Sequence, residues 1–310
     1  MKRLLLASVA FLALLSGLAS ASGGSPPTGQ IVFGMNRFCQ AKGTSGPEPV
    51  DCGKGEVAVV DADGSNLRVL THDTVTETNP VWSPDGREIA FIRPTAHTSS
   101  QVWVMNAGGT HQHPVTRLRN APQLYSADDE PVLSWSPDGR QIVFAAFPNK
   151  QGGREQLYLV NVRTHALKRL PTLATGATDP VWSPNGRWIA FTGAVAPDQV
   201  FLMSASTHHV HQLRSHGGGH VAGLGLAWSP DSTRLAFNAL GRLTVFDLET
   251  GLFHVVVRDG DAPSWSPDGQ WIVFAEGDYV KEVRSDGQGI RHILYVASKK
   301  GLNFEPDWGR

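Results

Sequence analysis

One motif recurs along this chain and constrains its fold more than any other feature. It runs from a tryptophan through a Ser-Pro-Asp-Gly turn into an apolar segment, as in NPVWSPDGREIAF at 79–91 and DPVWSPNGRWIAF at 179–191. Related versions are SWSPDGRQIVF at 134–144, AWSPDSTRLAF at 227–237 and SWSPDGQWIVF at 264–274. A unit repeated in this way predicts an architecture of similar modules packed side by side.

The spacing of the repeats indicates which module they form. Their intervals lie close to the roughly 40–50 residues of one β-propeller blade. The repeated tryptophans are Trp82, Trp135, Trp182, Trp228, Trp265 and Trp308. An apolar triplet also occurs six times, at 31–33, 89–91, 142–144, 189–191, 235–237 and 272–274. We therefore expect six blades.

Each unit is predicted to contain four short strands. The segment ending at the tryptophan is the first strand. The next four residues form a tight turn, because Pro presets φ, Asp can bond to the backbone and Gly accepts a positive φ. The apolar triplet lies in the second strand, and segments such as 101–109 and 66–70 supply third and fourth strands. We expect each tryptophan ring between adjacent blades, where its large apolar area is buried.

The two ends of the repeat array complement each other. Residues 29–36, GQIVFGMN, resemble a second strand without a first, and residues 305–310, EPDWGR, resemble a first strand without a second. We expect the Trp308 strand to pair with Ile31–Phe33, which closes the ring and removes exposed sheet edges. The prediction is an all-β, six-bladed propeller with four-stranded blades over residues 29–310.

The first residues are predicted to be a leader. A basic start, an apolar run and the small residues Ala19-Ser20-Ala21 fit a signal peptide over residues 1–21, with a flexible linker at 22–28. The alternative is an uncleaved membrane anchor, although the apolar run is short for a membrane span. No other segment is long and apolar enough to cross a bilayer. We expect an exported protein without a transmembrane segment after cleavage.

Export determines how the two cysteines are interpreted. Cys39 and Cys52 flank a polar loop that contains Gly and Pro. In an oxidising compartment such a pair is most simply a disulfide, worth roughly 3 kcal/mol for a loop this short. A redox or metal-binding pair is the alternative.

Composition and motifs exclude several function classes. The formal net charge is −1, which does not favour a nucleic-acid partner. The sequence has no Gly-x-Ser-x-Gly elbow, no phosphate-binding Gly loop and no His-Glu-x-x-His helix motif. The segment DADGSN at 61–66 is faintly similar to a calcium loop, but Asp-Gly is ordinary hairpin chemistry at that position.

These motifs together resemble a known family. The Trp-Ser-Pro-Asp-Gly turns, the apolar triplets and segments such as EVAVVDADG at 56–64 are similar to the TolB-type propeller repeat, also called a WD-like repeat. The resemblance covers residues 29–310 and implies protein contacts in the cell envelope. We expect the propeller alone, without the N-terminal α/β domain of TolB. Some peptidases of the prolyl oligopeptidase class carry similar repeats ahead of a hydrolase domain.

A set of polar residues precedes the tryptophan strands. Its members are Asn79, Asp128, Asp129, Glu130, Asp179, Asp261 and Glu305. Because first strands line the axial channel of a propeller, we expect a broken acidic ring at one channel mouth, able to hold a cation, a basic peptide or a sugar. Alternatively, each side chain only caps the turn before a proline. Arg87, Arg140 and Arg187 are expected at the opposite end of the blades.

A histidine-rich segment is a second candidate site. His209 and His211 would share one face of a strand, and with His220 they could bind a transition metal. The alternative is a solvated outer strand followed by a Gly-rich connection.

The sequence thus favours a non-catalytic binding module that is monomeric, exported to the periplasm or beyond, and bound to a protein or peptide of the cell envelope. The first alternative is a propeller enzyme acting on a sugar or lactone with a divalent metal in the axial channel. The second alternative is a structural propeller without a ligand. We expect no cofactor, apart from the divalent cation of the enzyme alternative.

Overall fold

The structure is a computed structural model. It describes residues 29–39, 50–72, 75–95, 99–116, 124, 132–148, 153–193, 198–277, 279–295 and 306–309, without the side chains of 36–39, 50–54, 99 and 295. The predicted leader and linker therefore lie outside the described residues. The described part consists of six four-stranded sheets, and no helix in it is long and apolar enough to cross a membrane.

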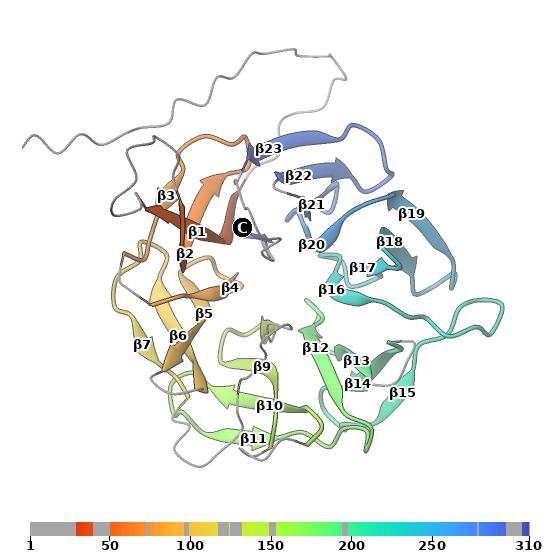
Figure 1. The fold of residues 1–310 in the computed structure, drawn as a ribbon. Coiled ribbons are helices and arrows are strands. Elements are labelled where there is room, and N and C mark those ends of the chain that lie inside the picture. Colours follow the sequence, from red (N-terminus) through yellow and green to blue (C-terminus); the bar gives the residue numbers. More distant parts are fainter. Residues whose placement is uncertain are drawn as a thin grey trace, which may run out of the picture.

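The six sheets are the blades of a propeller and follow one another around a ring (Figure 1). Blade 1 contains β24 (Asp307–Trp308), β1 (Gln30–Cys39), β2 (Val50–Asp61) and β3 (Arg68–Val69). Blade 2 contains β4 (Thr78–Trp82), β5 (Glu88–Thr95), β6 (Ser99–Asn106) and β7 (His113–Pro114). Blade 3 contains β8 (Leu133–Trp135), β9 (Gln141–Ala146), β10 (Gln156–Asn161) and β11 (Leu167–Arg169).

The second half of the ring repeats this pattern. Blade 4 contains β12 (Ala177–Trp182), β13 (Trp188–Gly193), β14 (Val200–Ser204) and β15 (Val210–Gln212). Blade 5 contains β16 (Leu224–Trp228), β17 (Arg234–Ala239), β18 (Arg242–Asp247) and β19 (Phe253–Val257). Blade 6 contains β20 (Asp261–Trp265), β21 (Trp271–Glu276), β22 (Tyr279–Arg284) and β23 (Arg291–Tyr295). The predicted six-bladed propeller is confirmed.

Blade 1 joins the two ends of the array. β24 pairs antiparallel with β1, with Trp308 opposite Ile31 and Asp307 opposite Val32, as the sequence predicts. Gly309 continues the pairing through its amide, which donates to the Gln30 carbonyl at 2.8 Å. A Cβ on Gly309 would lie 2.7 Å from the Trp82 indole, so this position has no room for a side chain. The ring is closed by a two-residue strand.

The Ser-Pro-Asp-Gly turn is held by its serine as well as its aspartate. The buried Ser83 hydroxyl donates to Asp85 Oδ1 at 2.7 Å and accepts the Glu88 amide at 2.9 Å. Asp85 Oδ1 also accepts the Arg87 amide at 3.1 Å, and Gly86 has a φ of 67°. Four further turns repeat this network, which begins at Ser136, Ser183, Ser229 and Ser266. The expected roles of Asp and Gly are confirmed.

The core is divided among the blade interfaces. Each of six buried clusters contains residues from two neighbouring blades. Five of them include a repeated tryptophan, and the partly buried Trp182 packs against the sixth. Between blades 1 and 2, for example, Val57 and Val59 pack with Trp82 and Ile89. The tryptophans lie between blades, as predicted.

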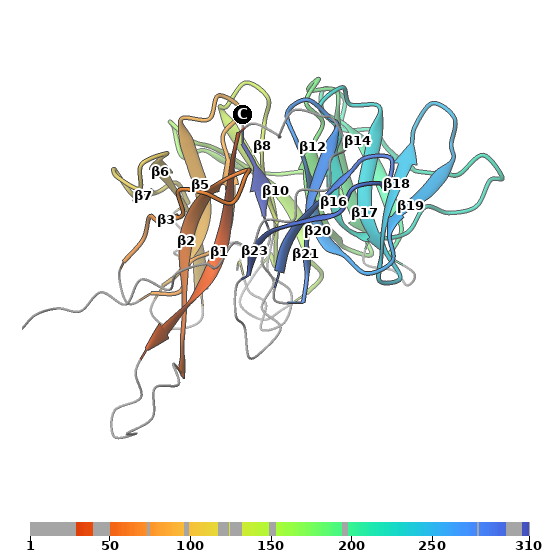
Figure 2. The same cartoon turned by 90° about the horizontal axis from the view of Figure 1, so that it is seen from above.

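Two faces of the ring are used below. We call the face that carries the Ser-Pro-Asp-Gly turns the turn face. Figure 2 shows the ring from the side, with the β1–β2 hairpin projecting past the other blades. Gly309 follows Trp308 at the position where a turn follows the other repeated tryptophans, so β1, which starts beside Gly309, starts at the turn face. The β1–β2 hairpin lies at the far end of β1 and therefore projects on the opposite face.

Candidate ligand-binding channel

An axial cavity of about 1100 Å³ runs between the innermost strands of the blades. First strands and the turns after them contribute its wall, in agreement with the predicted channel. The cavity reaches the surface at the turn face, where the exposed side chains of Asp85, Asp138 and Arg140 belong to its lining. Prolines of five turns surround this mouth: Pro84, Pro137, Pro184, Pro230 and Pro267.

One residue from each blade forms a ring within the channel wall. This inner ring consists of the residues directly before the repeated tryptophans: Val81, Ser134, Val181, Ala227, Ser264 and Asp307. Side chains alternate between the two faces of a strand, so a tryptophan packed against one neighbouring blade places the residue before it on the side of the other neighbouring blade, where it also lines the channel. The inner ring is therefore where sequence differences between repeats change the chemistry of the channel.

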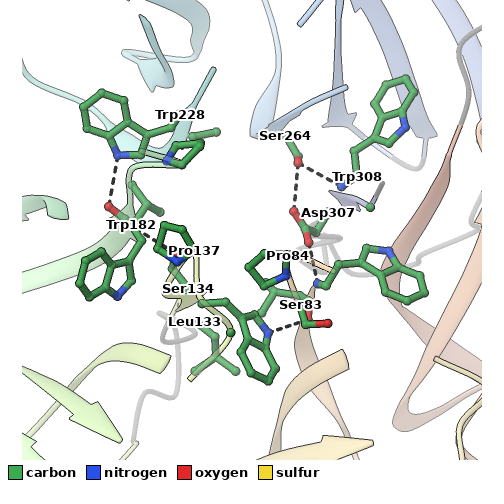
Figure 3. Close-up of a pocket in the computed structure, with 18 of the residues that line it drawn as sticks. Ser83, Pro84, Leu133, Ser134, Pro137, Trp182, Trp228, Ser264, Asp307 and Trp308 are labelled. Carbon is green, nitrogen blue, oxygen red and sulfur yellow. Dashed lines mark hydrogen bonds between the residues drawn. The ribbon is translucent and has the colours of Figure 1, made fainter. Parts of the chain in front are cut away.

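Three blade interfaces use the inner ring as a hydrogen-bond acceptor (Figure 3). The Trp182 amide donates to Ser134 Oγ at 2.9 Å, and the Trp308 amide donates to Ser264 Oγ at 3.0 Å. The Trp82 amide donates to Asp307 Oδ2 at 2.7 Å. In each case the inner-ring side chain of one blade binds the main chain of the next.

At the other three interfaces the inner-ring residue has no polar side chain. There the indole N–H of the next tryptophan donates to the main-chain carbonyl of the inner-ring residue. Trp135 donates to Val81 at 3.3 Å, Trp228 to Val181 at 3.2 Å and Trp265 to Ala227 at 3.2 Å. The residue before the tryptophan thus correlates with how neighbouring blades are joined.

Asp307 is the one charged member of the inner ring. Its Oδ1 accepts the Ser264 hydroxyl at 3.1 Å, so the carboxylate links blade 1 to both blade 6 and blade 2. The residue is half-buried and belongs to the lining of the channel. The surrounding protein still removes enough water that burial raises the pKa of the carboxyl, against hydrogen bonds from Trp82, Ser264 and Trp308.

The predicted acidic ring maps to a recurring β-bulge. Asn79 and Asp179 lie three residues before a tryptophan, with φ of 51° and 48°, and the pairing of β4 and β12 shifts register there. Gly225 and Ala262 have the same position and the same left-handed conformation. Asn, Asp and Gly adopt positive φ more readily than other residues, which supports a backbone role for Asn79 and Asp179.

None of the three described members of that predicted set lines the axial cavity. Asn79 is buried, Asp179 is half-buried, and the exposed Asp261 lies one residue before the bulge position. The remaining members, Asp128, Asp129, Glu130 and Glu305, lie outside the described residues. The acidic ring as a ligand site stays a prediction.

The histidine segment lies on the outside of blade 4. His211 is in β15 and packs edge-on against Trp188, with ring centroids 5.2 Å apart, and burial lowers its pKa. His209 precedes β15, and His220 forms an isolated bridge with Arg214. The described residues contain no group of three His, Cys, Asp or Glu placed to hold a metal ion. The metal site of His209, His211 and His220 stays a prediction.

The cysteines lie near the tip of the projecting hairpin. Cys39 is the last residue of β1 and Cys52 is in β2, on neighbouring antiparallel strands. Their side chains are outside the described part of the chain, so the disulfide stays a prediction.

Two buried glutamates lie away from the channel wall. Burial raises the pKa of Glu77 to about 7, although the Arg93 guanidinium lies 2.9 Å from its Oε1. Burial also raises the pKa of Glu282 to about 7, against the opposing charge of Arg291, 2.7 Å away. Neither glutamate belongs to the lining of the cavity.

Comparisons with known proteins agree with this architecture. The family described as "TolB beta propeller domain" matches residues 49–309. Over 243 residues the chain is 24% identical to the uncharacterized peptidase YuxL of Bacillus subtilis, which covers 74% of this chain and 34% of that protein. It is 27% identical over 107 residues to the Tol-Pal system protein TolB of Alcanivorax borkumensis, covering 34% of this chain and 22% of that protein.

A solved structure shows the same fold. The crystal structure of TolB from Acinetobacter baumannii superposes with a TM-score of 0.69 at 20% identity, covering 91% of this chain and 66% of that one. The chain spans about a third or less of the two curated relatives above. Because the family match extends over most of the sequence, this chain belongs to the TolB β-propeller domain family.

Proposed function

We propose that this propeller is an exported binding module that holds a protein or peptide partner in its axial channel. The observation that carries the proposal is the cavity of about 1100 Å³, open at the turn face. A wall that combines apolar surface with fixed polar groups is typical of sites that bind ligands specifically. In this wall Val81, Val181 and Ala227 supply apolar surface, and Ser134, Ser264 and Asp307 supply the polar groups.

The relatives support a partner in the cell envelope. The chain belongs to a family named after TolB, and a TolB relative carries the name of the Tol-Pal system. The leader-like residues 1–21 support export to the periplasm or beyond. We propose that the protein acts as a monomer, because the propeller closes its own ring and leaves no blade to be completed by a second copy.

Blocking the channel tests the proposal. Ala227→Trp would place an indole in the channel, whereas Lys168→Trp would place one on the exposed strand β11 as a matched control. Crosslinking and capture from the exporting cells would be compared for wild type and both variants. We expect one partner to be retained by wild type and Lys168→Trp and lost by Ala227→Trp. Equal capture by all three proteins would move the binding site out of the channel.

A second variant locates the binding end of the channel. The acidic set, which the sequence predicts at the channel mouth away from the turns, would be neutralised by changing Glu130, Asp179, Asp261 and Glu305 to their amides. Loss of the partner in this variant would assign the opposite mouth, and retention would assign the turn face.

The enzyme alternative has its own readout. The Bacillus subtilis relative is named a peptidase, although only 34% of that protein is matched. A propeller enzyme of the predicted alternative, acting on a sugar or lactone, would contain a divalent ion in stoichiometric amount. Metal analysis of the purified protein, followed by a substrate screen if an ion is found, separates that alternative from the binding module.

A further inference from the structure

The inner ring is chemically uneven, and the unevenness points to a class of ligand. Five of its six members are uncharged, and the sixth, Asp307, places a carboxylate in the channel wall (Figure 3). The other charged groups of the lining, among them Asp85, Asp138 and Arg140, lie at the exposed mouth. Asp307 is therefore the single carboxyl of the inner ring, whereas Asp85 and Asp138 supply carboxyls at the mouth.

The carboxylate is oriented but not saturated. Oδ2 accepts one main-chain N–H from Trp82, and Oδ1 accepts one hydroxyl from Ser264. An ionised carboxylate can accept about four hydrogen bonds. The main-chain N–H of Trp308 adds a third contact, so about one acceptor position remains on a residue that lines the cavity.

No cation of the described residues pairs with this carboxylate. The described ion pairs join other groups, such as Arg93 with Glu77 and Arg291 with Glu282. Arg140 and Arg163 are the basic groups of the lining, and both come from blade 3 rather than from a neighbour of blade 1. A charge held in a cavity without a counter-ion is most favourable when a ligand supplies one.

The rest of the wall distinguishes between kinds of cation. A Ca²⁺ ion takes six or more oxygen ligands. The described residues contain no group of three His, Cys, Asp or Glu side chains that could hold a metal ion. The wall instead offers apolar surface from Val81, Val181 and Ala227. An aliphatic stem that ends in a charge suits such a wall, because Lys and Arg bury their methylene groups and keep the charged head at a polar site.

We propose that the axial channel receives a lysine or arginine side chain of the partner, with its cationic head bound to Asp307 and its stem against the apolar wall. The inference rests on the proposed function and names the chemistry of the partner. The hydrogen bonds from Trp82 and Ser264 hold the carboxylate in place before the ligand arrives, so little ordering is needed on binding.

Peptide selection tests this inference. A library of random decapeptides displayed on phage would be panned against the immobilised protein, with Ala227→Trp used to identify peptides that bind through the channel. We expect channel-binding peptides to share a Lys or Arg at one position. Replacing that residue with norleucine, which keeps the stem and removes the charge, should weaken binding roughly tenfold to a hundredfold.

Two protein variants link that penalty to Asp307. In Asp307→Asn, which keeps an acceptor for the Trp82 amide, replacing the basic residue of the peptide with norleucine should no longer weaken binding. Ser134→Asp in the Asp307→Asn background moves the carboxylate to another inner-ring position that already accepts a tryptophan amide, and preference for a basic residue should return. Thermal unfolding of each variant controls for folding, and the norleucine comparison on wild type does not depend on any variant.

The outcomes separate this inference from the proposed function. Peptides that are blocked by Ala227→Trp but have no common basic residue, or whose norleucine penalty persists in Asp307→Asn, would overturn the inference and leave the channel as the binding site. Peptides unaffected by Ala227→Trp, or no selected peptide at all, would overturn both.

Discussion

Three blade interfaces are joined by a hydrogen bond to an inner-ring side chain, and the other three by a hydrogen bond from an indole N–H. Each of the six interfaces nevertheless contains one tryptophan of the repeat. In the first kind Ser134, Ser264 or Asp307 accepts the amide of the next tryptophan. In the second kind a main-chain carbonyl accepts the indole N–H instead. Trp82 and Trp182, both at interfaces of the first kind, keep a buried indole nitrogen that has no hydrogen-bond partner among the described groups.

The comparison shows that one residue has two consequences. The residue before the tryptophan determines whether a polar side chain can join neighbouring blades. The same residue faces the axial cavity. A polar inner-ring residue therefore adds a blade contact and a polar group in the channel wall together, which is how a structural repeat can acquire ligand specificity.

The largest expected loss of stability distinguishes the interface that closes the ring from an interface within the array. Trp308→Ala removes a buried ring from the two-residue strand that closes the propeller, and we expect a loss of about 3–5 kcal/mol in the free energy of unfolding. Trp182→Ala should cost less, because Trp182 is already partly exposed. Urea unfolding measures both, and an equal or larger loss for Trp182→Ala would show that the closure is not special.

The next effect ranks two interfaces of the first kind. Ser264→Ala removes an acceptor for the Trp308 amide and a donor to Asp307, so we expect about 1–3 kcal/mol. Ser134→Ala removes one neutral hydrogen bond, to the Trp182 amide, and should cost about 0.5–1.5 kcal/mol. The same unfolding experiment ranks them, and a reversed order would contradict the assigned contacts.

A smaller effect compares the two kinds directly. Trp82 and Trp265 are both buried, but only the Trp265 indole N–H has an acceptor. Trp→Phe removes similar volume at either position, and the additional lost hydrogen bond should make Trp265→Phe more destabilising by about 1 kcal/mol. Equal losses would mean that the indole bonds do not contribute to stability.

The smallest effect is a pH dependence that only one inner-ring residue can produce. The folded protein binds the Asp307 proton more tightly than the unfolded chain does, because burial raises this pKa above its usual 3.8. The contribution of Asp307 to stability is therefore greatest below about pH 4 and is lost as pH rises through the raised pKa.

The matched variants isolate this contribution. Relative to wild type, Asp307→Asn should gain stability as pH increases from 4, whereas Ser134→Ala should show a constant difference. Glu77 and Glu282 titrate in all three proteins, so their effects cancel. A constant difference for Asp307→Asn, measured by urea unfolding across this range, would argue against the raised pKa.

Much of the fold could be predicted because the repeat has a local physical meaning. The Ser-Pro-Asp-Gly turn, the apolar second strand and the complementary ends lead directly to six blades and to pairing of Trp308 with Ile31. The role of the turn serine was not predicted, because its two hydrogen bonds become visible only when the turn is folded.

The candidate site was predicted less well. The sequence drew attention to Asn79 and Asp179, conspicuous polar residues before prolines, but the structure places them at a bulge that favours positive φ. Asp307 was missed, although it is the one acidic residue directly before a repeated tryptophan. Comparing that column across the repeats would have found it, because the first strand is the innermost strand of each blade and this column holds one acidic residue.

The most direct test of channel binding is site-specific photo-crosslinking in the exporting cells. A photoreactive residue would replace Ala227 or Val181 in the channel, or Leu167 on the outer strand β11. We expect both channel positions to crosslink to one common partner and the outer position to give no such product. A partner that crosslinks from Leu167 but from neither channel position would contradict the assignment of the channel as the binding site.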